Sequence, residues 1–269
     1  MKLGIAIAPK EALPSAFVVF RDEIELSIQK AYSLGFDGVE MALLDSSQID
    51  VKMVGDLCKK LHLDIPMISS GQVYAQGQLC FTSPDPAIRA QAVSRIKGLV
   101  DLAEVFGSMV NIGRVRGPVE EGEPYENSEK RFLESLEEVA LYAEPKGVVI
   151  AVEPVNRYEI NFINRVDEAY ALCRKLDRPN VKIMPDVFHM NIEDASIEAG
   201  LVSCIDMIAY IHFADSNRLA PGMGHLNFPN IINVLKAVGY DGYVTTEILP
   251  LPSPEEAAQR ASKYLKALL

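Results

Sequence analysis

Residues 147–153 have the sequence GVVIAVE, an apolar run without alternation that ends in a glutamate. A run of this kind is typical of a parallel strand that is buried on both faces. Three later segments are also apolar runs with a polar side chain at or next to the end: VKIMPD at 181–186, IAYIHF at 208–213 and GYVTTEI at 242–248. Segments with helical periodicity separate them, which indicates repeated βα units.

The same rhythm extends over the whole chain. Further strands are expected at 3–8, 38–43, 64–69 and 108–113, and helices at 22–34, 51–61, 86–106, 126–144, 165–176, 195–204, 228–238 and 254–268. Eight strands and eight helices in 269 residues suit a closed α/β barrel, which typically has about 250 residues. We therefore predict an α/β fold, a (β/α)8 TIM barrel in which residues 1–269 form a single domain. An open doubly wound sheet is the alternative, but IAIAPKEALP lacks its Gly-rich phosphate turn.

Composition excludes several classes of partner. The formal net charge of −11 disfavours binding to nucleic acid and to anionic membranes. No apolar stretch approaches the roughly 18 residues that span a bilayer, and the N-terminus lacks the features of a signal peptide. The four cysteines have no CxxC spacing and are expected to be reduced core thiols. We expect a cytoplasmic protein.

Ligand-type side chains lie at the ends of four successive strands. They are Glu153, Asp186, His212 and Glu247. In a barrel these carboxyl ends are neighbours on one rim, so the four side chains are expected to converge. Three carboxylates beside one another repel unless a cation neutralises them. This ligand set suits one divalent metal per chain, with Mn as the first expectation and Co, Mg or Zn as alternatives.

Such a site can move a carbon-bound proton. The hydrogen next to a ketone is too weakly acidic to leave at pH 7 unless the developing enediolate is stabilised, and a divalent metal provides that stabilisation. Epimerisation also needs a base on one face and an acid on the other. Glu153 and Glu247 are separated by the strands that carry Asp186 and His212, so we expect them to be this catalytic pair.

Several segments around these residues are distinctive. They are EPVNRYE at 153–159, DVFHMN at 186–191, HFADSNR at 212–218, PGMGH at 221–225 and TTE at 245–247. On these segments the chain resembles the xylose-isomerase-like barrel superfamily, and within it the ketose 3-epimerases related to D-tagatose 3-epimerase. The resemblance implies the same four metal ligands and the same acid/base pair. It also implies that His189 and Arg218 hold the carbonyl-end oxygens of the substrate, and that Glu159 contacts a further hydroxyl.

Two arginines follow the fourth strand, in the segment GRVRG at 113–117. Arg114 and Arg116 are two positions apart and point the same way if the strand continues. We expect one of them to bind a carboxylate on the substrate, as in a keto-sugar acid. The alternative is a salt bridge to the acidic residues Glu120, Glu121 and Glu123.

Two long loops and three further polar residues are also candidates for the wall of the pocket. The long loops 70–85 and 114–125 are candidate lids, because long βα loops lie at the catalytic end of a barrel. Gln72 and Tyr74 are candidate pocket residues. His225 follows a Pro-Gly-x-Gly turn, where organising the loop is at least as plausible as contacting a ligand.

The predicted function is a metal-dependent epimerase that acts at C3 of a ketose or keto-sugar acid through a cis-enediolate. An aldose–ketose isomerase and an inosose-type dehydratase need the same acid/base residues and stay open. An abasic-site endonuclease of the same superfamily is disfavoured, because it would need a basic groove and several more histidine ligands, whereas this chain has four histidines and a net charge of −11. A sugar-binding module without catalytic activity is also disfavoured, because it would have no need for an acid/base pair. By analogy with related barrels we expect a homodimer or homotetramer.

Overall fold

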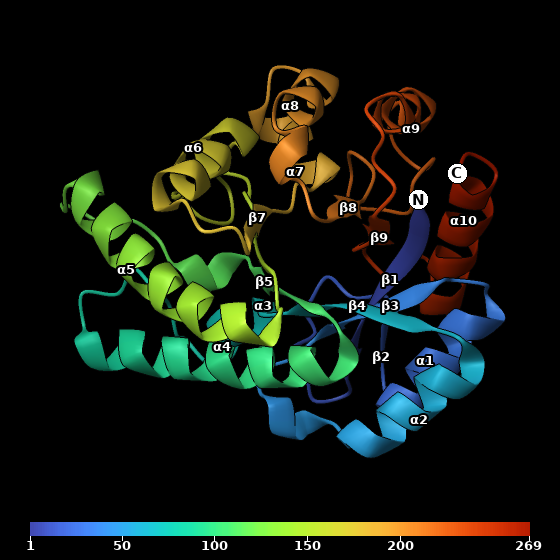
Figure 1. The fold of residues 1–269 in the computed structure, drawn as a ribbon. Helices are drawn as coiled ribbons and strands as arrows, with labels where there is room; N and C mark the ends of the chain where they lie inside the picture. The colour runs from blue at the N-terminus through green and yellow to red at the C-terminus, as the bar shows by residue number, and fades with distance from the viewer.

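The computed structural model describes residues 1–269 and shows parallel strands curled into a barrel with helices around it (Figure 1). The strands are β1 (Lys2–Pro9), β2 (Phe20–Asp22), β3 (Gly38–Ala42), β4 (Asp64–Ser69), β5 (Met109–Ile112), β6 (Ile150–Val152), β7 (Val181–Ile183), β8 (Ile211–Phe213) and β9 (Tyr243–Thr246). Neighbours pair in the order β7-β6-β5-β4-β3-β1-β9-β8. Two isolated bridges, Ile183 with Ile208 and Asp186 with His212, join β7 to β8. The predicted TIM-barrel fold is confirmed.

All eight predicted helices are present, with ends that differ from the expected ones by at most two residues. They are α1 (Ile24–Ser33), α2 (Val51–Leu61), α4 (Pro86–Phe106), α5 (Tyr125–Ala143), α6 (Val166–Leu176), α8 (Ile197–Ser203), α9 (Phe228–Ala237) and α10 (Pro254–Lys266). One short strand and two short α-helices are present beyond those expected from the sequence: β2, which pairs with β1, and the helices α3 (Gly71–Ala75) and α7 (Val187–Glu193). The loops that hold α3 and α7 also carry residues of the candidate site.

Strands in the second half of the chain are shorter than the sequence predicts. Regular pairing of β7 ends at Ile183, because Pro185 has no amide hydrogen to donate and its carbonyl instead accepts from the backbone of His212 at 2.9 Å. β6 likewise pairs only up to Val152, although the Glu153 amide still donates to Ile112 on β5. The polar side chains at these strand ends therefore lie where the regular ladder stops.

The barrel interior is built in two layers. Side chains two residues apart on a strand point to the same face, so each inward apolar residue has an inward polar residue above it. Met184 lies below Asp186, Ala151 below Glu153 and Tyr210 below His212. The apolar layer is a small buried cluster of Met67, Ala151, Met184 and Tyr210. The polar layer lies at the carboxyl end of the strands, where a TIM barrel places its active site.

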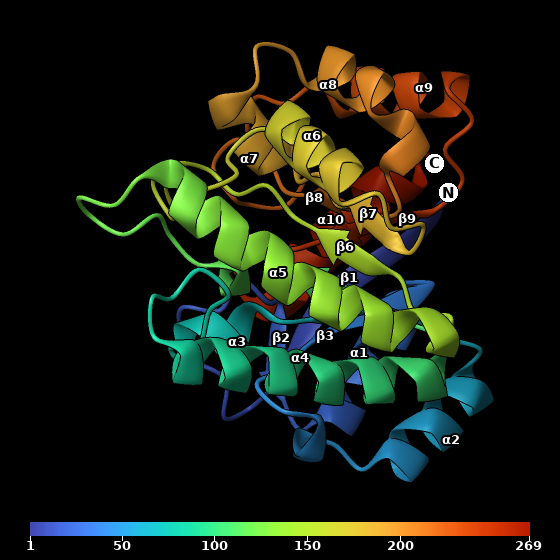
Figure 2. The same cartoon turned by 60° about the vertical axis from the view of Figure 1, so that its left-hand side comes forward.

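Outside the barrel, the long helices α4 and α5 run side by side across one face (Figure 2). The loop that precedes α5 projects away from the body of the molecule in the same view. The cysteines Cys58, Cys80, Cys173 and Cys204 are free and buried, as expected. No helix combines the length and the apolar character needed to cross a membrane.

Candidate metal centre and active site

The structure brings the four predicted metal ligands together. Glu153 follows β6, Asp186 begins α7 as its N-cap, His212 lies in β8 and Glu247 follows β9. One ligand atom from each of the four lies within 4.8 Å of every other. A separation of that size suits a cation held at about 2.0–2.6 Å from several ligands.

His212 gives the strongest sign that this cluster fits a cation. Its Nε2 contacts Oε2 of Glu40 at 2.8 Å, whereas Nδ1 is buried and has no hydrogen-bond partner. This Nδ1 lies 3.3 Å from Oε1 of Glu153 and 3.8 Å from Oε2 of Glu247. A histidine with one nitrogen on a carboxylate and the other directed at a group of ligands is the usual arrangement of a metal-binding imidazole. The residues present therefore fit a divalent metal.

The shifted pKa values of the cluster also indicate a site for a cation. Burial raises the pKa of Glu247 to about 8, although the charges of Arg218 and His212 oppose it. Burial would also raise the pKa of Glu153, but the neighbouring His212, whose Nδ1 lies 3.3 Å away, outweighs it and lowers the pKa. Burial disfavours the charged imidazole, yet Glu40, Glu247 and Glu153 together raise the pKa of His212 well above its usual value. Without a cation, protons balance the negative charge of these carboxylates.

Arg218 is bound to two of the four ligands. Its guanidinium donates to Asp186 and to Glu247 while only 4% of the side chain is exposed. The ring of Phe17 lies 4.8 Å from the guanidinium carbon and that of Phe188 lies 4.6 Å away. The backbone of Arg218 has φ +62°, a left-handed conformation that is uncommon for a residue with a side chain. Such an outlier is typical of a residue held for function.

His189 and Glu159 lie on the same side of the pocket. Nδ1 of His189 contacts the Asn156 amide at 2.7 Å, and Nε2 lies 3.7 Å from Oδ2 of Asp186. Asn156 also donates to Glu159 at 3.2 Å, so one amide positions both side chains. Burial lowers the pKa of His189. The imidazole is thus prepared as a neutral hydrogen-bonding group.

The two arginines of GRVRG do not point the same way, and the prediction that rested on a continuing strand is wrong. β5 ends at Ile112, and Arg114–Arg116 form a 3₁₀ turn. Arg116 is fully buried and donates to the backbone carbonyls of Gly113, Glu153, Phe162 and Ile163. The guanidinium of Arg116 therefore donates to the protein backbone and does not face the pocket. The expectation that Arg116 binds substrate is wrong.

Arg114, by contrast, lines the pocket. Its guanidinium lies 3.7 Å from Oε2 of Glu159, and about a quarter of the side chain is exposed. Neither arginine pairs with the acidic stretch 120–123; Glu123 instead forms an ion pair with Arg131. The alternative interpretation of GRVRG as a local salt bridge is therefore also wrong.

The first half of the barrel contributes supporting residues that the sequence analysis missed. Glu40 on β3 is fully buried and holds His212, and Asn111 on β5 donates to Oε2 of Glu153 at 2.9 Å. A side chain on Gly113 would approach the same Glu153 oxygen to 2.7 Å, so this position has no room for one. The available signal was a polar residue inside an apolar strand, as in GVEMAL and SMVNIG.

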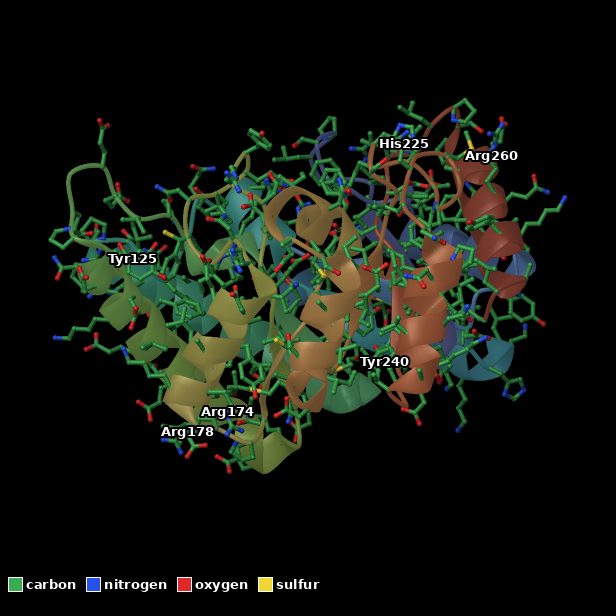
Figure 3. All side chains as sticks on the ribbon, turned by 90° about the horizontal axis from the view of Figure 1, so that it is seen from above. Tyr125, Arg174, Arg178, His225, Tyr240 and Arg260 are labelled. Carbon is green, nitrogen blue, oxygen red and sulfur yellow. The ribbon has the colours of Figure 1, made fainter.

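The pocket above the cluster is an open cavity with an empty volume of about 490 Å³, including its mouth. Both candidate lids contribute to its wall, through Gln72 from 70–85 and Arg114 from 114–125, whereas Tyr74 lies outside the lining. His225 is exposed, and Figure 3 labels it on the same side of the molecule as Arg260. Its loop is organised by the buried Asp215, which accepts from the amides of Ser216, Gly222 and Leu226.

Comparison with known proteins agrees with this fold and site. The family model described as xylose isomerase-like TIM barrel matches residues 28–268. The chain belongs to this family, and its named relatives show that it is an epimerase.

Three relatives illustrate the relationship. An L-ribulose 3-epimerase of Methylomonas sp. (strain DH-1) is 31% identical over 82% of this chain and 77% of its own length. A 3-dehydro-D-guloside 4-epimerase of Escherichia coli (strain K12) is 30% identical over 59% of this chain and 64% of its own length. A crystal structure of D-psicose 3-epimerase with D-tagatose from Clostridium cellulolyticum H10 superposes with a TM-score of 0.84 at 24% identity, covering 100% of this chain and 99% of the other.

Proposed function

We propose that this chain is a divalent-metal-dependent sugar epimerase that moves a proton at C3 of a ketose or keto-sugar acid through a cis-enediolate. The observation that carries the proposal is the convergence of Glu153, Asp186, His212 and Glu247 within 4.8 Å at the mouth of the barrel. A hard to borderline ligand set of this kind favours Mn, with Co, Mg or Zn as alternatives. When bound there, the metal would polarise the ketone and stabilise negative charge on the oxygens of the enediolate.

Glu153 and Glu247 are the proposed base and acid. They reach the cluster from β6 and β9, with β7 and β8 between them. Their environments also push their pKa values in opposite directions, upward for Glu247 and downward for Glu153. One carboxylate removes the proton from the carbon beside the ketone, and the other delivers a proton to the opposite face, so the configuration inverts.

Substrate orientation is assigned to three further residues. His189 and Arg218 lie beside Asp186, and we propose that they hold the oxygens at the carbonyl end of the substrate. Glu159 lines the pocket next to His189 and would accept a hydrogen bond from a hydroxyl. Asn156 contacts His189 and Glu159, and Phe17 and Phe188 contact Arg218, so these side chains are already oriented before substrate binds.

A keto-glycoside is a second candidate substrate, because the Escherichia coli relative is named as a 4-epimerase of a 3-dehydro sugar. In both named activities the inverted carbon is adjacent to a ketone. The same acid/base pair would therefore serve either substrate, and the pocket wall would select between them.

Proton NMR in D2O tests the proposed reaction. Ketoses, keto-sugar acids and a 3-keto-glycoside are incubated with chelator-treated protein and with the same protein after addition of Mn²⁺. We expect metal-dependent exchange of the hydrogen beside the ketone, together with formation of its epimer. Product with an aldehyde signal would instead identify an isomerase, and loss of a hydroxyl a dehydratase. Absence of exchange with every sugar would refute an enzyme of this chemistry.

Arg114 decides between neutral and acidic substrates in this proposal. Its guanidinium lines the pocket and is held only by a loose contact with Glu159. A charge-assisted hydrogen bond to a substrate carboxylate is worth about 1.5–3 kcal/mol, or roughly 10- to 150-fold in kcat/KM. Arg114→Ala should therefore lose about that factor on keto-sugar acids and much less on plain ketoses. Arg157→Ala, on an exposed arginine paired with Glu193, is the matched control. Equal losses of Arg114→Ala on both classes would refute carboxylate recognition.

A further inference from the structure

The loop between β1 and β2 covers one side of the pocket, and nothing in the sequence assigned it a role. Its residues Ala16, Phe17 and Val18 line the cavity. The underside of the loop packs as a small cluster that is separate from the main core and made almost entirely of alanine: Ala6, Ala8, Ala12, Ala16, Val18 and Ala42. Alanine side chains bury little apolar area, so these contacts hold the loop weakly.

Phe17 is the one large side chain that this loop places against the site. The guanidinium carbon of Arg218 lies over its ring, 4.8 Å from the ring centroid, and also over the ring of Phe188 at 4.6 Å. A planar cation that contacts two aromatic rings cannot tilt freely without weakening a cation–π contact. The stacking therefore fixes the plane in which Arg218 donates to Asp186 and Glu247.

We propose that Phe17 is a positioning residue that connects the closed state of the β1–β2 loop to catalysis. With the loop closed, the rings of Phe17 and Phe188 both contact the guanidinium of Arg218, and Arg218 in turn orients the carboxylates of Asp186 and Glu247. With the loop open, Arg218 keeps one ring only and its donors are free to turn. Substrate can then enter and leave through the opened side. The catalytic part of this inference rests on the function proposed above.

The electrostatic setting favours this arrangement. Arg218 is nearly fully buried beside two carboxylates, and its Nε has no hydrogen-bond partner. Its orientation is therefore determined by the two ion pairs and the two rings, without a hydrogen bond at Nε. Removing one ring leaves the charge in place but releases the constraint on its direction. The expected consequence is a defect in turnover more than in folding or in metal binding.

Kinetics of Phe17 variants give the first test. Phe17→Leu should lower kcat by about 3- to 30-fold, the factor that corresponds to loss of one buried cation–π contact. The KM and the melting temperature should change little, and Phe17→Tyr should restore kcat to within about threefold of the natural protein, because the ring is retained. Ser15→Ala, on an exposed residue of the same loop, is the control and should behave as the natural protein. An increase in KM with unchanged kcat would overturn the proposal, because Phe17 would then only form part of the pocket wall.

Fluorescence tests the stacking without relying on activity. The chain contains ten tyrosines but no tryptophan, so Phe17→Trp introduces a single tryptophan that can be excited selectively at the red edge of its absorption. We expect the introduced indole to be poorly quenched by acrylamide, and at least about twofold more strongly quenched when Arg218→Leu removes its cationic partner. Equal quenching with and without Arg218 would overturn the stacking. If the natural protein turned over none of the sugars, the proposed function would fail while this measurement still decided whether Phe17 holds Arg218.

Discussion

The two halves of the barrel contribute differently to the site. All four candidate metal ligands come from the second half, from the ends of β6, β7, β8 and β9. The first half contributes groups that hold these ligands or form the wall: Phe17, Glu40, Gln72, Asn111, Arg114 and Arg116. In the second half the regular strands are only three or four residues long. Regular backbone pairing between these strands ends early, and the residues that follow it can turn toward the candidate metal site.

This difference indicates a division of labour. Glu153, Asp186 and Glu247 lie just beyond the regular pairing of their strands, whereas His212 lies within β8. Glu40 and Asn111, which contact two of these ligands, lie within β3 and β5, where the backbone is held by neighbouring strands. Two supporting groups bond across the barrel to the other half, Glu40 to His212 and Asn111 to Glu153. Precision at the site thus depends on both halves.

The largest effects should follow substitution of the acid/base pair in the second half. Glu153→Gln and Glu247→Gln each retain the size of the side chain but remove a proton acceptor. We expect kcat to fall by about 10²- to 10⁴-fold, the usual contribution of a general acid or base. Epimer formation by NMR measures the loss, and Glu121→Gln on an exposed residue is the control. Retention of more than a tenth of the activity in either variant would remove that residue from the acid/base pair.

Arg116 should show the largest effect on stability. Arg116→Met gives an uncharged side chain of similar length and removes the arginine donor from four buried carbonyls, of which those of Gly113 and Ile163 still accept from a backbone amide. An unsatisfied buried polar group costs about 1–3 kcal/mol, so loss of the donor to Glu153 and Phe162 should lower the free energy of unfolding by at least about 2 kcal/mol.

Urea denaturation at 25 °C measures that change. Arg114→Met, which loses only a partly exposed contact with Glu159, should cost less than about 1 kcal/mol. Equal losses in the two variants would contradict the different roles assigned to these neighbouring arginines.

Glu40 tests whether support from the first half reaches the metal. Glu40→Gln weakens the carboxylate–imidazole contact that orients His212. Loss of such a partner typically lowers metal affinity by about 10- to 100-fold. Competition with a chelator measures the affinity for Mn²⁺, and Glu134→Gln on the exposed side of α5 is the control. Unchanged affinity for Mn²⁺ would show that the contact of Glu40 with His212 does not contribute to metal binding.

The sequence predicted the two halves unequally well, for physical reasons. Ligands at strand ends share one rim in any TIM barrel, so periodicity alone brought the four of them together. Glu40 and Asn111 were visible as polar residues inside apolar strands, but only coordinates reveal which side chain each one meets. The prediction for Arg116 failed because a 3₁₀ turn rotates successive residues by about 120°, so positions i and i+2 diverge. Phe17 lies in a loop without periodicity, and no local pattern shows what such a loop covers.

The last prediction concerns pH and the protons that the cluster carries. Burial raises the pKa of Glu247 to about 8, and the pKa of His212 is also raised, whereas that of Glu153 is lowered. As the pH falls through these raised pKa values, a metal must displace protons from Glu247 and His212, while Glu153 stays ionised. Affinity for Mn²⁺ should fall by about tenfold for each proton displaced per unit decrease in pH, and should approach a plateau above the raised pKa values. Calorimetry at pH 6, 7 and 8, in buffers with different ionisation enthalpies, measures both the affinity and the number of protons released. If the second half were a preformed, fully ionised site, the affinity would be independent of pH in this range and no protons would appear.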